Sequence, residues 1–439
     1  MRVAMIGTGY VGLVSGACFA DFGHAVVCVD KDADKIAALA RGEIPIHEPG
    51  LDELVARNSD GKRLMFTTDL AAAVHGADAV FIAVGTPSRR GDGHADLTYV
   101  YDAAREIAGA LSGYAVVVTK STVPVGTGDE VERIIRAAAP KAQFAVVSNP
   151  EFLREGAAIR DFKHPDRVVC GTEDEHARRV MSELYRPLFL NRNPIMFTDR
   201  RSAELIKYAA NAFLATKITF INEIADLAEK VDADVQEVAR GIGLDNRIGS
   251  KFLHAGPGFG GSCFPKDTRA LIKIAQDCDV QLRVVEAVLG VNDNRKRAMA
   301  RKVATAVGAS LRGKTVAVLG LTFKPDTDDM REAPSIPLVT GLLDMGAKVR
   351  AHDPVGMEQA RKELPEIEYV DDPYACVKGA DAMVVVTEWV QYRTLDLERL
   401  KKEMAQPVVI DLRNIYRPED MAAHGFTYES VGRPPLERN

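Results

Sequence analysis

Residues 2–12 read Arg-Val-Ala-Met-Ile-Gly7-Thr-Gly9-Tyr-Val-Gly12, a short apolar run that passes directly into three glycines with GxGxxG spacing. This context predicts a buried strand, a tight turn and the start of a helix. Gly7 permits the turn, Gly9 lets the backbone approach a pyrophosphate, and Gly12 lets the helix pack closely on the strand. The pattern therefore predicts a strand–turn–helix unit that binds a dinucleotide.

A carboxylate stands where the predicted second strand ends. Asp30 follows Gly12 by 18 residues, close to the distance of about 20 at which such units carry the acid that binds a ribose. Its negative charge would repel the 2′-phosphate of NADP, although Lys31 beside it weakens that repulsion. The sequence therefore predicts NAD as the cofactor.

The first 195 residues or so alternate short β-branched runs with helical stretches. This alternation is typical of a parallel sheet covered by helices on both faces. The run at residues 79–84 is apolar throughout, as strands buried on both faces must be. We expect strands at residues 2–7, 25–30, 79–84, 115–119 and 144–148.

The C-terminal third repeats the pattern of the N-terminal third. Residues 316–320 resemble residues 3–7, residues 346–353 resemble residues 23–30, and residues 379–386 resemble residues 76–83. Matches in the same order predict a second doubly wound domain. Its first turn has Gly320 but no second or third glycine, and Lys324 follows. That loop favours an anionic ligand other than a pyrophosphate in the usual pose, and a plain surface loop is the alternative.

The middle of the chain has a helical pattern. A long amphipathic stretch runs from residue 201 to about 230, and a glycine-rich loop at residues 254–263 precedes more helical sequence. We expect an α/β fold in which two doubly wound Rossmann-like domains are joined by a central helical region with one long helix. The expected domains are residues 1–195, which bind NAD, residues 196–310, which carry the cysteine loop, and residues 311–439.

Composition and charge argue against several classes of protein. The chain of 439 residues has a formal net charge of −6 and no basic tract, which argues against a nucleic-acid or membrane surface. No apolar run approaches the ~20 residues of a membrane span. The six cysteines and nine histidines show no ligand spacing, so we expect neither a disulfide framework nor a metal site. Scattered thiols favour a reducing compartment, and we expect a cytoplasmic protein.

Residues 256–267 form the most unusual stretch, Gly-Pro-Gly-Phe-Gly-Gly-Ser-Cys-Phe-Pro-Lys-Asp. Its glycines let the backbone fold closely around a ligand, and Pro265 is typical of a first helical turn. Cys263 would then lie near a helix N-terminus and beside Lys266, where the pKa of a thiol falls and a reactive thiolate forms. Asp267, in the same turn, is a candidate general base or its positioning group.

Two polar residues lie within the mostly apolar sequence of the expected long helix. Lys207 and Asn211 are four residues apart and therefore share one face, where together they could hold an alkoxide or a water near a hydride acceptor. A solvated charged face is the alternative. Their neighbours Leu205, Ile206 and Phe213 are expected to pack against the rest of the chain.

Three more candidates follow strand ends. Glu151 and Glu155 come after the strand predicted at 144–148, and Thr122 comes after the strand that ends at residue 119. Open α/β sheets bind ligands at the carboxyl ends of their strands. We therefore expect these side chains in the cleft where cofactor and substrate meet.

Together these motifs resemble the UDP-glucose/GDP-mannose dehydrogenase family, most closely its UDP-glucose-oxidising members, over essentially the whole chain. The run at residues 258–267 is highly specific. The other matching segments are residues 7–12, 45–51, 84–87, 120–126, 148–156, Lys207 with Asn211, and residues 323–331. His47 departs from the pattern, because such sequences more often carry Tyr there, which puts one local cofactor-loop contact in doubt.

The resemblance implies a four-electron oxidation at C6 of a nucleotide-sugar, with two NAD molecules used in turn. The Cys263 thiolate would attack the intermediate aldehyde, the thiohemiacetal would yield a second hydride, and water would hydrolyse the thioester. Lys207 and Asn211 would steady the developing oxyanion. Asp267 or Glu155 would handle protons.

The resemblance also assigns binding residues. Thr122 and Glu151 would orient the hydrolytic water. The residues implied for NAD are Gly7, Gly9, Tyr10, Val11, Gly12, Asp30, Lys35, Thr86, Thr122, Glu155, Lys266 and Arg331. Those implied for the nucleotide-sugar are Glu151, Phe152, Leu153, Lys207, Arg247, Phe252, Leu253, Gly256, Gly260 and Lys324. Residues 311–439 would bind UDP, the long helix would form a homodimer, and Arg247 would reach the substrate across the dimer interface.

Four other interpretations of the sequence predict a different substrate or no reaction at all. GDP-mannose oxidation is the alternative within the family, although Phe264 and residues 323–326 favour UDP-glucose. UDP-N-acetylmannosamine-type relatives tend to carry His before the cysteine. A two-electron hydroxyacid dehydrogenase would not need Cys263 or a second α/β domain. A non-catalytic NAD sensor would have no use for Cys263, Lys207 and Asn211 together.

Overall fold

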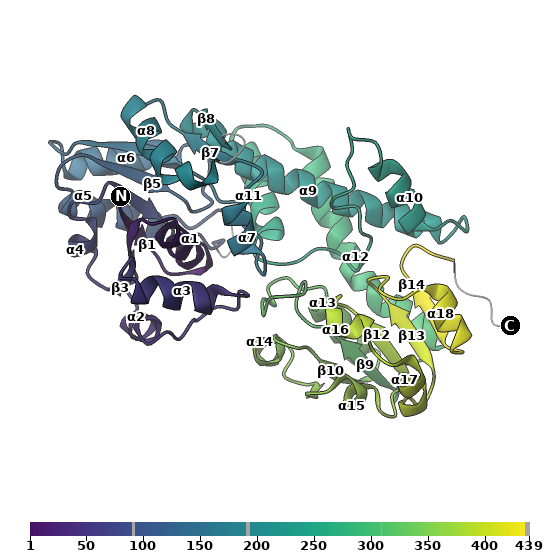
Figure 1. Ribbon diagram of the computed structural model, residues 1–439. Helices are drawn as coiled ribbons and strands as arrows, with labels where there is room; N and C mark the ends of the chain where they lie inside the picture. Colours follow the sequence, from purple (N-terminus) through teal and green to yellow (C-terminus); the bar gives the residue numbers. More distant parts are fainter. Residues whose placement is uncertain (90–92, 190–193, 309, 435–439) are drawn as a thin grey trace. The chain divides into compact units, whose positions relative to one another are not determined.

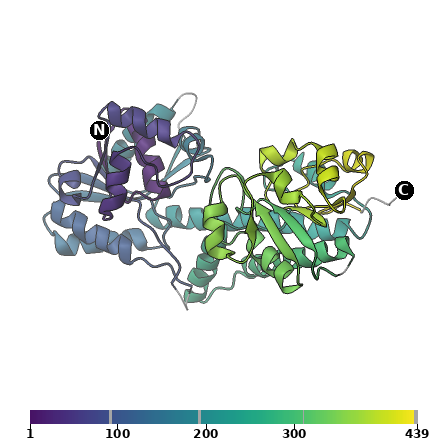
Figure 2. The same cartoon turned by 90° about the horizontal axis from the view of Figure 1, so that it is seen from below.

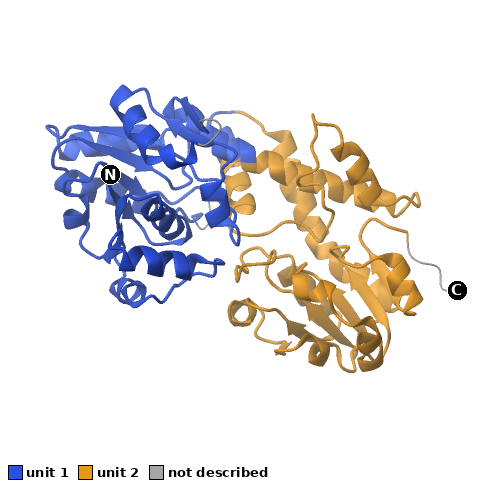
Figure 3. Cartoon of the chain, in the orientation of Figure 1, with its two compact units in different colours: residues 1–210, 273–279 blue, residues 211–272, 280–439 orange. Residues whose placement is uncertain are grey.

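A computed structural model of the chain describes residues 1–89, 93–189, 194–308 and 310–434. The chain packs as two compact units (Figure 3), residues 1–210 with 273–279 and residues 211–272 with 280–439. Their boundary falls within two helices, α9 (Arg200–Ala228) and α11 (Phe264–Asp277). Helix α9 confirms the long helix expected from residue 201 to about 230.

The first unit contains an eight-stranded sheet with the order β3-β2-β1-β4-β5-β6-β7-β8. All five expected strands are present, and β3, β7 and β8 are additional. Neighbouring strands are parallel except β6 and β7, which pair antiparallel. The strands are β1 (Arg2–Ile6), β2 (Ala25–Val29), β3 (Leu64–Thr67), β4 (Ala79–Ile82), β5 (Ala115–Thr119), β6 (Phe144–Ser148), β7 (Val168–Gly171) and β8 (Ile195–Thr198).

Helices cover both faces of this sheet (Figure 1), as the apolar strands require. One core joins the sheet to α1 (Tyr10–Asp21), α2 (Ala33–Ala40), α3 (Leu51–Asp60), α7 (Ala158–Lys163) and α8 (Glu175–Leu184). The opposite core contains α4 (Leu70–Val74), α5 (Thr98–Ala110) and α6 (Thr127–Ala138). Every residue of β4, β5 and β6 is buried, and each large apolar side chain buried there contributes about 1.5–3 kcal/mol.

The second unit repeats this design. Its six parallel strands have the order β11-β10-β9-β12-β13-β14, which matches β3-β2-β1-β4-β5-β6 position by position and confirms the repeat. The strands are β9 (Thr315–Leu319), β10 (Lys348–His352), β11 (Glu368–Tyr369), β12 (Ala382–Val385), β13 (Val408–Asp411) and β14 (Thr427–Ser430).

Helices also cover both faces of the second sheet (Figure 2). One core includes α10 (Val235–Gly243), α12 (Arg283–Val307), α13 (Ser335–Asp344) and α14 (Met357–Glu363). The other includes α15 (Pro373–Val377), α16 (Val390–Arg393), α17 (Leu397–Glu403) and α18 (Pro418–Ala423). No helix in the described residues is long and apolar enough to span a membrane.

Helix α9 exposes apolar side chains. The expectation that Leu205 and Phe213 pack within the chain is wrong, because they are 44% and 66% exposed. Phe213, Phe220 and Leu227 are all exposed and recur every seven residues, close to two helical turns, so they lie along one stripe. Apolar spacing along a helix therefore does not establish that the face packs within the same chain.

Candidate active site

The glycine turn after β1 has the geometry of a dinucleotide cradle. Gly7 has a φ of +102°, and a Cβ there would lie 2.6 Å from the carbonyl oxygen of Ala83. A Cβ on Gly12 would lie 2.0 Å from the carbonyl oxygen of Gly7, whereas the space beside Gly9 is open. Helix α1 begins at the next residue. Its N-terminal N–H groups and dipole favour a pyrophosphate at this turn.

Asp30 follows β2, beside this turn. Its Oδ2 accepts hydrogen bonds from the Thr8 amide (3.0 Å) and hydroxyl (2.6 Å), and from the Lys35 ammonium (3.0 Å). Burial raises the pKa of Asp30, but the hydrogen bonds from Thr8 and Lys35 outweigh this effect and hold the pKa at about 2. The carboxylate is therefore charged at neutral pH, as an acceptor for ribose hydroxyls must be.

Lys207 and Glu151 form a buried ion pair in the first unit. The Lys207 Nζ lies 3.2 Å from Oε1 of Glu151, and the two side chains are 4% and 6% exposed. The ammonium also lies 5.3 Å from the ring centre of Phe152, and Glu151 Oε2 accepts from the amide of Leu153. This burial excludes a solvated helix face. Removing one partner would leave an uncompensated charge at a cost of about 3–5 kcal/mol.

Asn211 and Asp267 form a second buried pair, in the second unit. Asn211 Nδ2 donates to Asp267 Oδ2 at 2.6 Å, and Lys266 Nζ lies 3.2 Å from Oδ1. Helix α11 begins directly after Cys263, and the Asp267 amide donates to the Cys263 carbonyl. The thiol is partly exposed. The expected placement of Cys263 at a helix N-terminus, with Asp267 one turn later, is therefore confirmed.

The cysteine loop is packed against the segment that follows β9. A Cβ on Gly260 would lie 2.4 Å from the carbonyl oxygen of Glu332, and a Cβ on Gly261 would lie 2.8 Å from the ring of Phe323. The Gly261 amide donates to the Arg331 carbonyl at 2.8 Å. These glycines are required because no side chain fits between the two segments.

Comparison with known proteins identifies the family. The chain matches three successive profiles of the UDP-glucose/GDP-mannose dehydrogenase family, the NAD binding domain at residues 1–189, the central domain at 201–294 and the UDP binding domain at 317–418. The chain belongs to the UDP-glucose/GDP-mannose dehydrogenase family. It is therefore an NAD-dependent dehydrogenase that acts on nucleotide-sugars.

Similar proteins span the whole chain. A UDP-glucose 6-dehydrogenase from Rhizobium meliloti (strain 1021) is 66% identical, covering 99% of this chain and 100% of the relative. The UDP-glucose 6-dehydrogenase TuaD from Bacillus subtilis (strain 168) is 49% identical, covering 99% and 94%. A solved UDP-glucose dehydrogenase from Pyrobaculum islandicum is 41% identical with a TM-score of 0.90, covering 98% of this chain and 97% of that chain.

The second α/β domain of this dehydrogenase has lost the features of a dinucleotide site. Asp353 occupies the position that matches Asp30, but it is completely buried. Its carboxylate accepts from the amides of Leu321 (2.7 Å) and Gly356 (2.7 Å) and from the indole of Trp389 (3.2 Å). Unlike Asp30, whose side chain is 20% exposed, this carboxylate has no exposed surface that a ribose could reach.

The remaining predicted substrate residues of the dehydrogenase lie in the second unit. Leu253 and Gly256 are buried, and Gly256 is held by Asn222. Phe252 has a φ of +65°, and Lys324 is half-buried over the ring of Phe323. Arg247 is exposed and pairs with Asp245, and its contact with substrate stays a prediction.

Sequence reasoning missed two carboxylates of the dehydrogenase. Glu48 is buried and accepts from the Tyr10 hydroxyl and from the amides of Gly156 and Ala158. It therefore ties the glycine turn to the loop that carries Glu155. In the sequence, residues 45–51 appear only as a motif shared with the family, and a charged residue within a Pro- and Gly-rich loop is the signal that could have indicated Glu48. Glu204, on α9, is the second.

Proposed function

We propose that this dehydrogenase oxidises UDP-glucose to UDP-glucuronate, with Cys263 as the covalent nucleophile. The observation that carries the proposal is the position of Cys263 directly before α11, with the Asn211–Asp267 pair one turn away. The similar proteins named above as UDP-glucose dehydrogenases support the substrate. GDP-mannose is the alternative, because the same cysteine chemistry would serve its oxidation.

The proposed reaction balances as two oxidations and one hydrolysis. Conversion of the C6 alcohol to a carboxylate removes two hydrides, consumes one water and releases three protons. NAD supplies the hydride acceptor for each oxidation, held by the turn at Gly7–Gly12 and by Asp30. The Cys263 sulfur forms a bond to C6 of the aldehyde, remains attached through the second oxidation, and leaves as thiolate when water attacks the thioester.

The Lys207–Glu151 and Asn211–Asp267 pairs would stabilise the negative charge that develops on the oxygen at C6. Lys207 and Asn211 donate to the oxygen that becomes negative when the alcohol loses its proton and again when sulfur attacks. Asp267, held by Asn211, would accept the proton from that oxygen. Glu151 and Thr122 would orient the hydrolytic water, and Glu155 would transfer its proton.

The domains would divide this work. Residues 1–195 would bind NAD, residues 196–310 would supply the cysteine loop and the dimer contact, and residues 311–439 would bind the UDP group. The exposed stripe of Phe213, Phe220 and Leu227 on α9 supports a homodimer through that helix. Arg247 would then reach the nucleotide-sugar bound to the other copy.

Counting the NADH released per sugar tests the function. UDP-glucose should yield two NADH for each molecule of uronate, and GDP-mannose should be a poor substrate. The Cys263→Ala variant should perform the first oxidation slowly and form no acid. One NADH per UDP-glucose in the wild-type enzyme, or full acid formation by Cys263→Ala, would contradict the proposal.

A further inference from the structure

Glu204 is a buried carboxylate with three hydrogen-bond donors. It lies on α9, one turn before Lys207, and is 2% exposed. Its Oε2 accepts from the Gly126 amide at 2.6 Å. Its Oε1 accepts from the Gly128 amide at 2.8 Å and from the Ser148 hydroxyl at 3.0 Å. One side chain of α9 thus holds the start of α6 and the end of β6.

The glycines make this approach possible. A Cβ on Gly128 would lie 3.0 Å from Oε1 of Glu204 and 2.8 Å from Oγ of Ser148, and Gly126 has a φ of +93°. Since α6 begins at Thr127, the carboxylate also faces the positive end of the helix dipole, which favours an anion. Burial raises the pKa of Glu204, while the glycine amides and Ser148 oppose that rise.

The segment held by Glu204 also carries Thr122. At its start, the Ser121 hydroxyl donates to the carbonyl of Val84 at 2.7 Å, and the Thr86 hydroxyl donates to the carbonyl of Thr122 at 2.9 Å. At its end, the two glycine amides are held by Glu204. Thr122 therefore lies in a short loop that is fixed on both sides.

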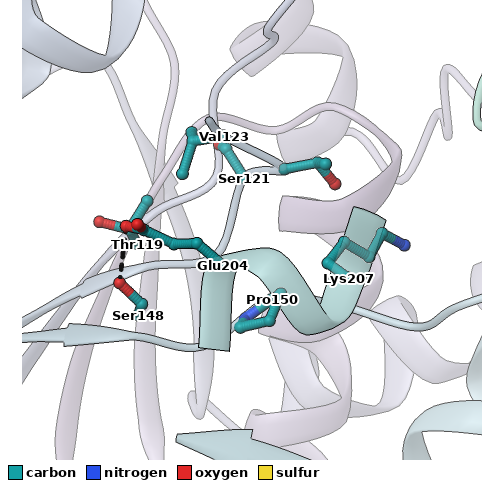
Figure 4. A pocket seen from close by; sticks show the side chains of 8 residues that line it. Thr119, Ser121, Val123, Ser148, Pro150, Glu204 and Lys207 are labelled. Carbon is teal, nitrogen blue, oxygen red and sulfur yellow. Dashed lines mark hydrogen bonds between the residues drawn. The ribbon is translucent and has the colours of Figure 1, made fainter. Parts of the chain in front are cut away.

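Figure 4 shows a cavity lined by Ser148, Glu204 and Lys207. Thr122 also lines this cavity. The Glu204 carboxylate points toward Ser148, whereas the Lys207 ammonium points away from it. The cavity volume is about 10 Å³, close to the ≳10–15 Å³ that one water needs. Glu204 is 2% exposed, and both of its carboxylate oxygens accept hydrogen bonds from this chain, so Glu204 acts on the loop and not on the substrate.

We propose that Glu204 is a positioning residue for thioester hydrolysis, because it fixes the loop at residues 120–128 from which Thr122 orients the attacking water. The inference rests on the proposed function, which gives Thr122 that task. The two oxidations need the sugar and NAD in place, the second of them also needs Cys263, and hydrolysis of the thioester needs the ordered water in addition. Displacing the loop should therefore slow hydrolysis more than the oxidations.

The Glu204→Gln variant tests this directly. A Gln amide has one acceptor oxygen, so its NH₂ group would face one of the two glycine N–H groups and displace the loop. A displacement of about 1 Å at a reacting group can lower its rate about 100-fold. Mixing the variant with UDP-glucose and excess NAD should give a rapid burst of two NADH per active site. Slow turnover should follow, with a substrate adduct on Cys263 detected by intact mass after acid quench.

Two controls separate positioning from folding. Ser148→Ala keeps the carboxylate and removes one donor, so it should slow the same step by a smaller factor. Asp174→Asn makes the same carboxylate-to-amide change at the N-terminus of α8, where Asp174 accepts from Ala177, and should leave turnover unchanged. A slow Glu204→Gln enzyme with neither burst nor adduct, or one that turns over at the wild-type rate, would overturn the inference.

A further pair of variants tests the proposed function separately from the role of Glu204. Thr122→Val should also accumulate the adduct, since Thr122 is assigned to the same water and its replacement leaves the Lys207–Glu151 ion pair intact. If Thr122→Val accumulates it and Glu204→Gln does not, the role of Glu204 is wrong and the function stands. If Cys263→Ala forms uronate at the wild-type rate, the covalent mechanism itself is wrong.

Discussion

Asn211 donates a hydrogen bond of 2.6 Å from its amide Nδ2 to Oδ2 of Asp267, a carboxylate that is 1% exposed. Asp267 lies one turn after Cys263 on α11, and the helix hydrogen bond between their backbones fixes that spacing. The pair thus brings an acceptor for protons to the loop that carries the thiol.

Asp267→Asn should lower kcat by about 100-fold or more, because a positioned general base contributes about 10²–10⁴-fold. The amide would also direct N–H groups toward Asn211. NAD affinity should change little, which equilibrium binding measures. Asp277→Asn, at an exposed carboxylate of the same helix, is the matched control and should retain normal turnover. Equal loss of kcat in both variants would contradict the role of Asp267.

Asp30→Asn should shift cofactor preference toward NADP. The change removes the negative charge that opposes a 2′-phosphate and frees Lys35, now 3.0 Å from Asp30, to pair with that phosphate. A charge-assisted hydrogen bond contributes about 1.5–3 kcal/mol, so kcat/KM for NAD should fall about 10- to 100-fold. Asp34→Asn, on the exposed side of α2, should not change the preference. An unaltered ratio of kcat/KM for NADP and NAD in Asp30→Asn would refute this assignment.

Lys120→Met should stabilise the protein at neutral pH. The Lys120 ammonium is 4% exposed, and burial lowers its pKa to about 8 from an ordinary value of 10.5. Below pH 8 both folded and unfolded chains carry the proton, and the folded state bears the cost of burying the charge. Between pH 8 and 10.5 only the unfolded chain remains protonated, so wild-type stability gains from rising pH.

The stability difference between Lys120→Met and wild type should therefore shrink from pH 7 to pH 10.5, by up to about 3 kcal/mol at ~1.4 kcal/mol per pKa unit. Asn149 and Tyr185, the partners of Lys120, also bond each other, so the variant leaves them satisfied. Urea unfolding of both proteins at four pH values measures the difference in their free energies of unfolding. A difference that does not change with pH would show that Lys120 does not titrate in this window.

Replacing Phe213 and Phe220 with Glu should yield a monomer. Both side chains are exposed on the α9 stripe, and charges there would oppose burial against a second copy. Sedimentation velocity should show half the wild-type mass. Val390→Glu, at an exposed apolar residue of the second unit, should leave the mass unchanged. A double variant that still sediments as wild type would place any dimer contact elsewhere.

Local sequence predicted the elements that local interactions determine. The glycine turn at Gly7–Gly12 and the start of α11 after Cys263 both follow from backbone requirements of adjacent residues, and both are as expected. The repeat predicted the strand order of the second sheet, because similar runs in the same order adopt the same topology.

Contacts between distant residues could not be predicted in this way. Glu48 binds the amide of a residue 108 positions later, and Glu204 binds one 78 positions earlier, and neither spacing leaves a periodic pattern. The sequence could not predict that Lys207 is buried against Glu151 for the same reason, because the two residues are 56 positions apart. The strands β3, β7 and β8 were not predicted, and each is only four residues long, too short for its own sequence to show a clear strand pattern.

The most direct test of the account is to stop wild-type turnover with acid within milliseconds, digest the protein and weigh the peptide that contains Cys263. The account predicts a transient population of this peptide joined to the oxidised nucleotide-sugar, which disappears when UDP-glucose is exhausted. Uronate formed at full rate while the Cys263 peptide stays unmodified at every time point would contradict it.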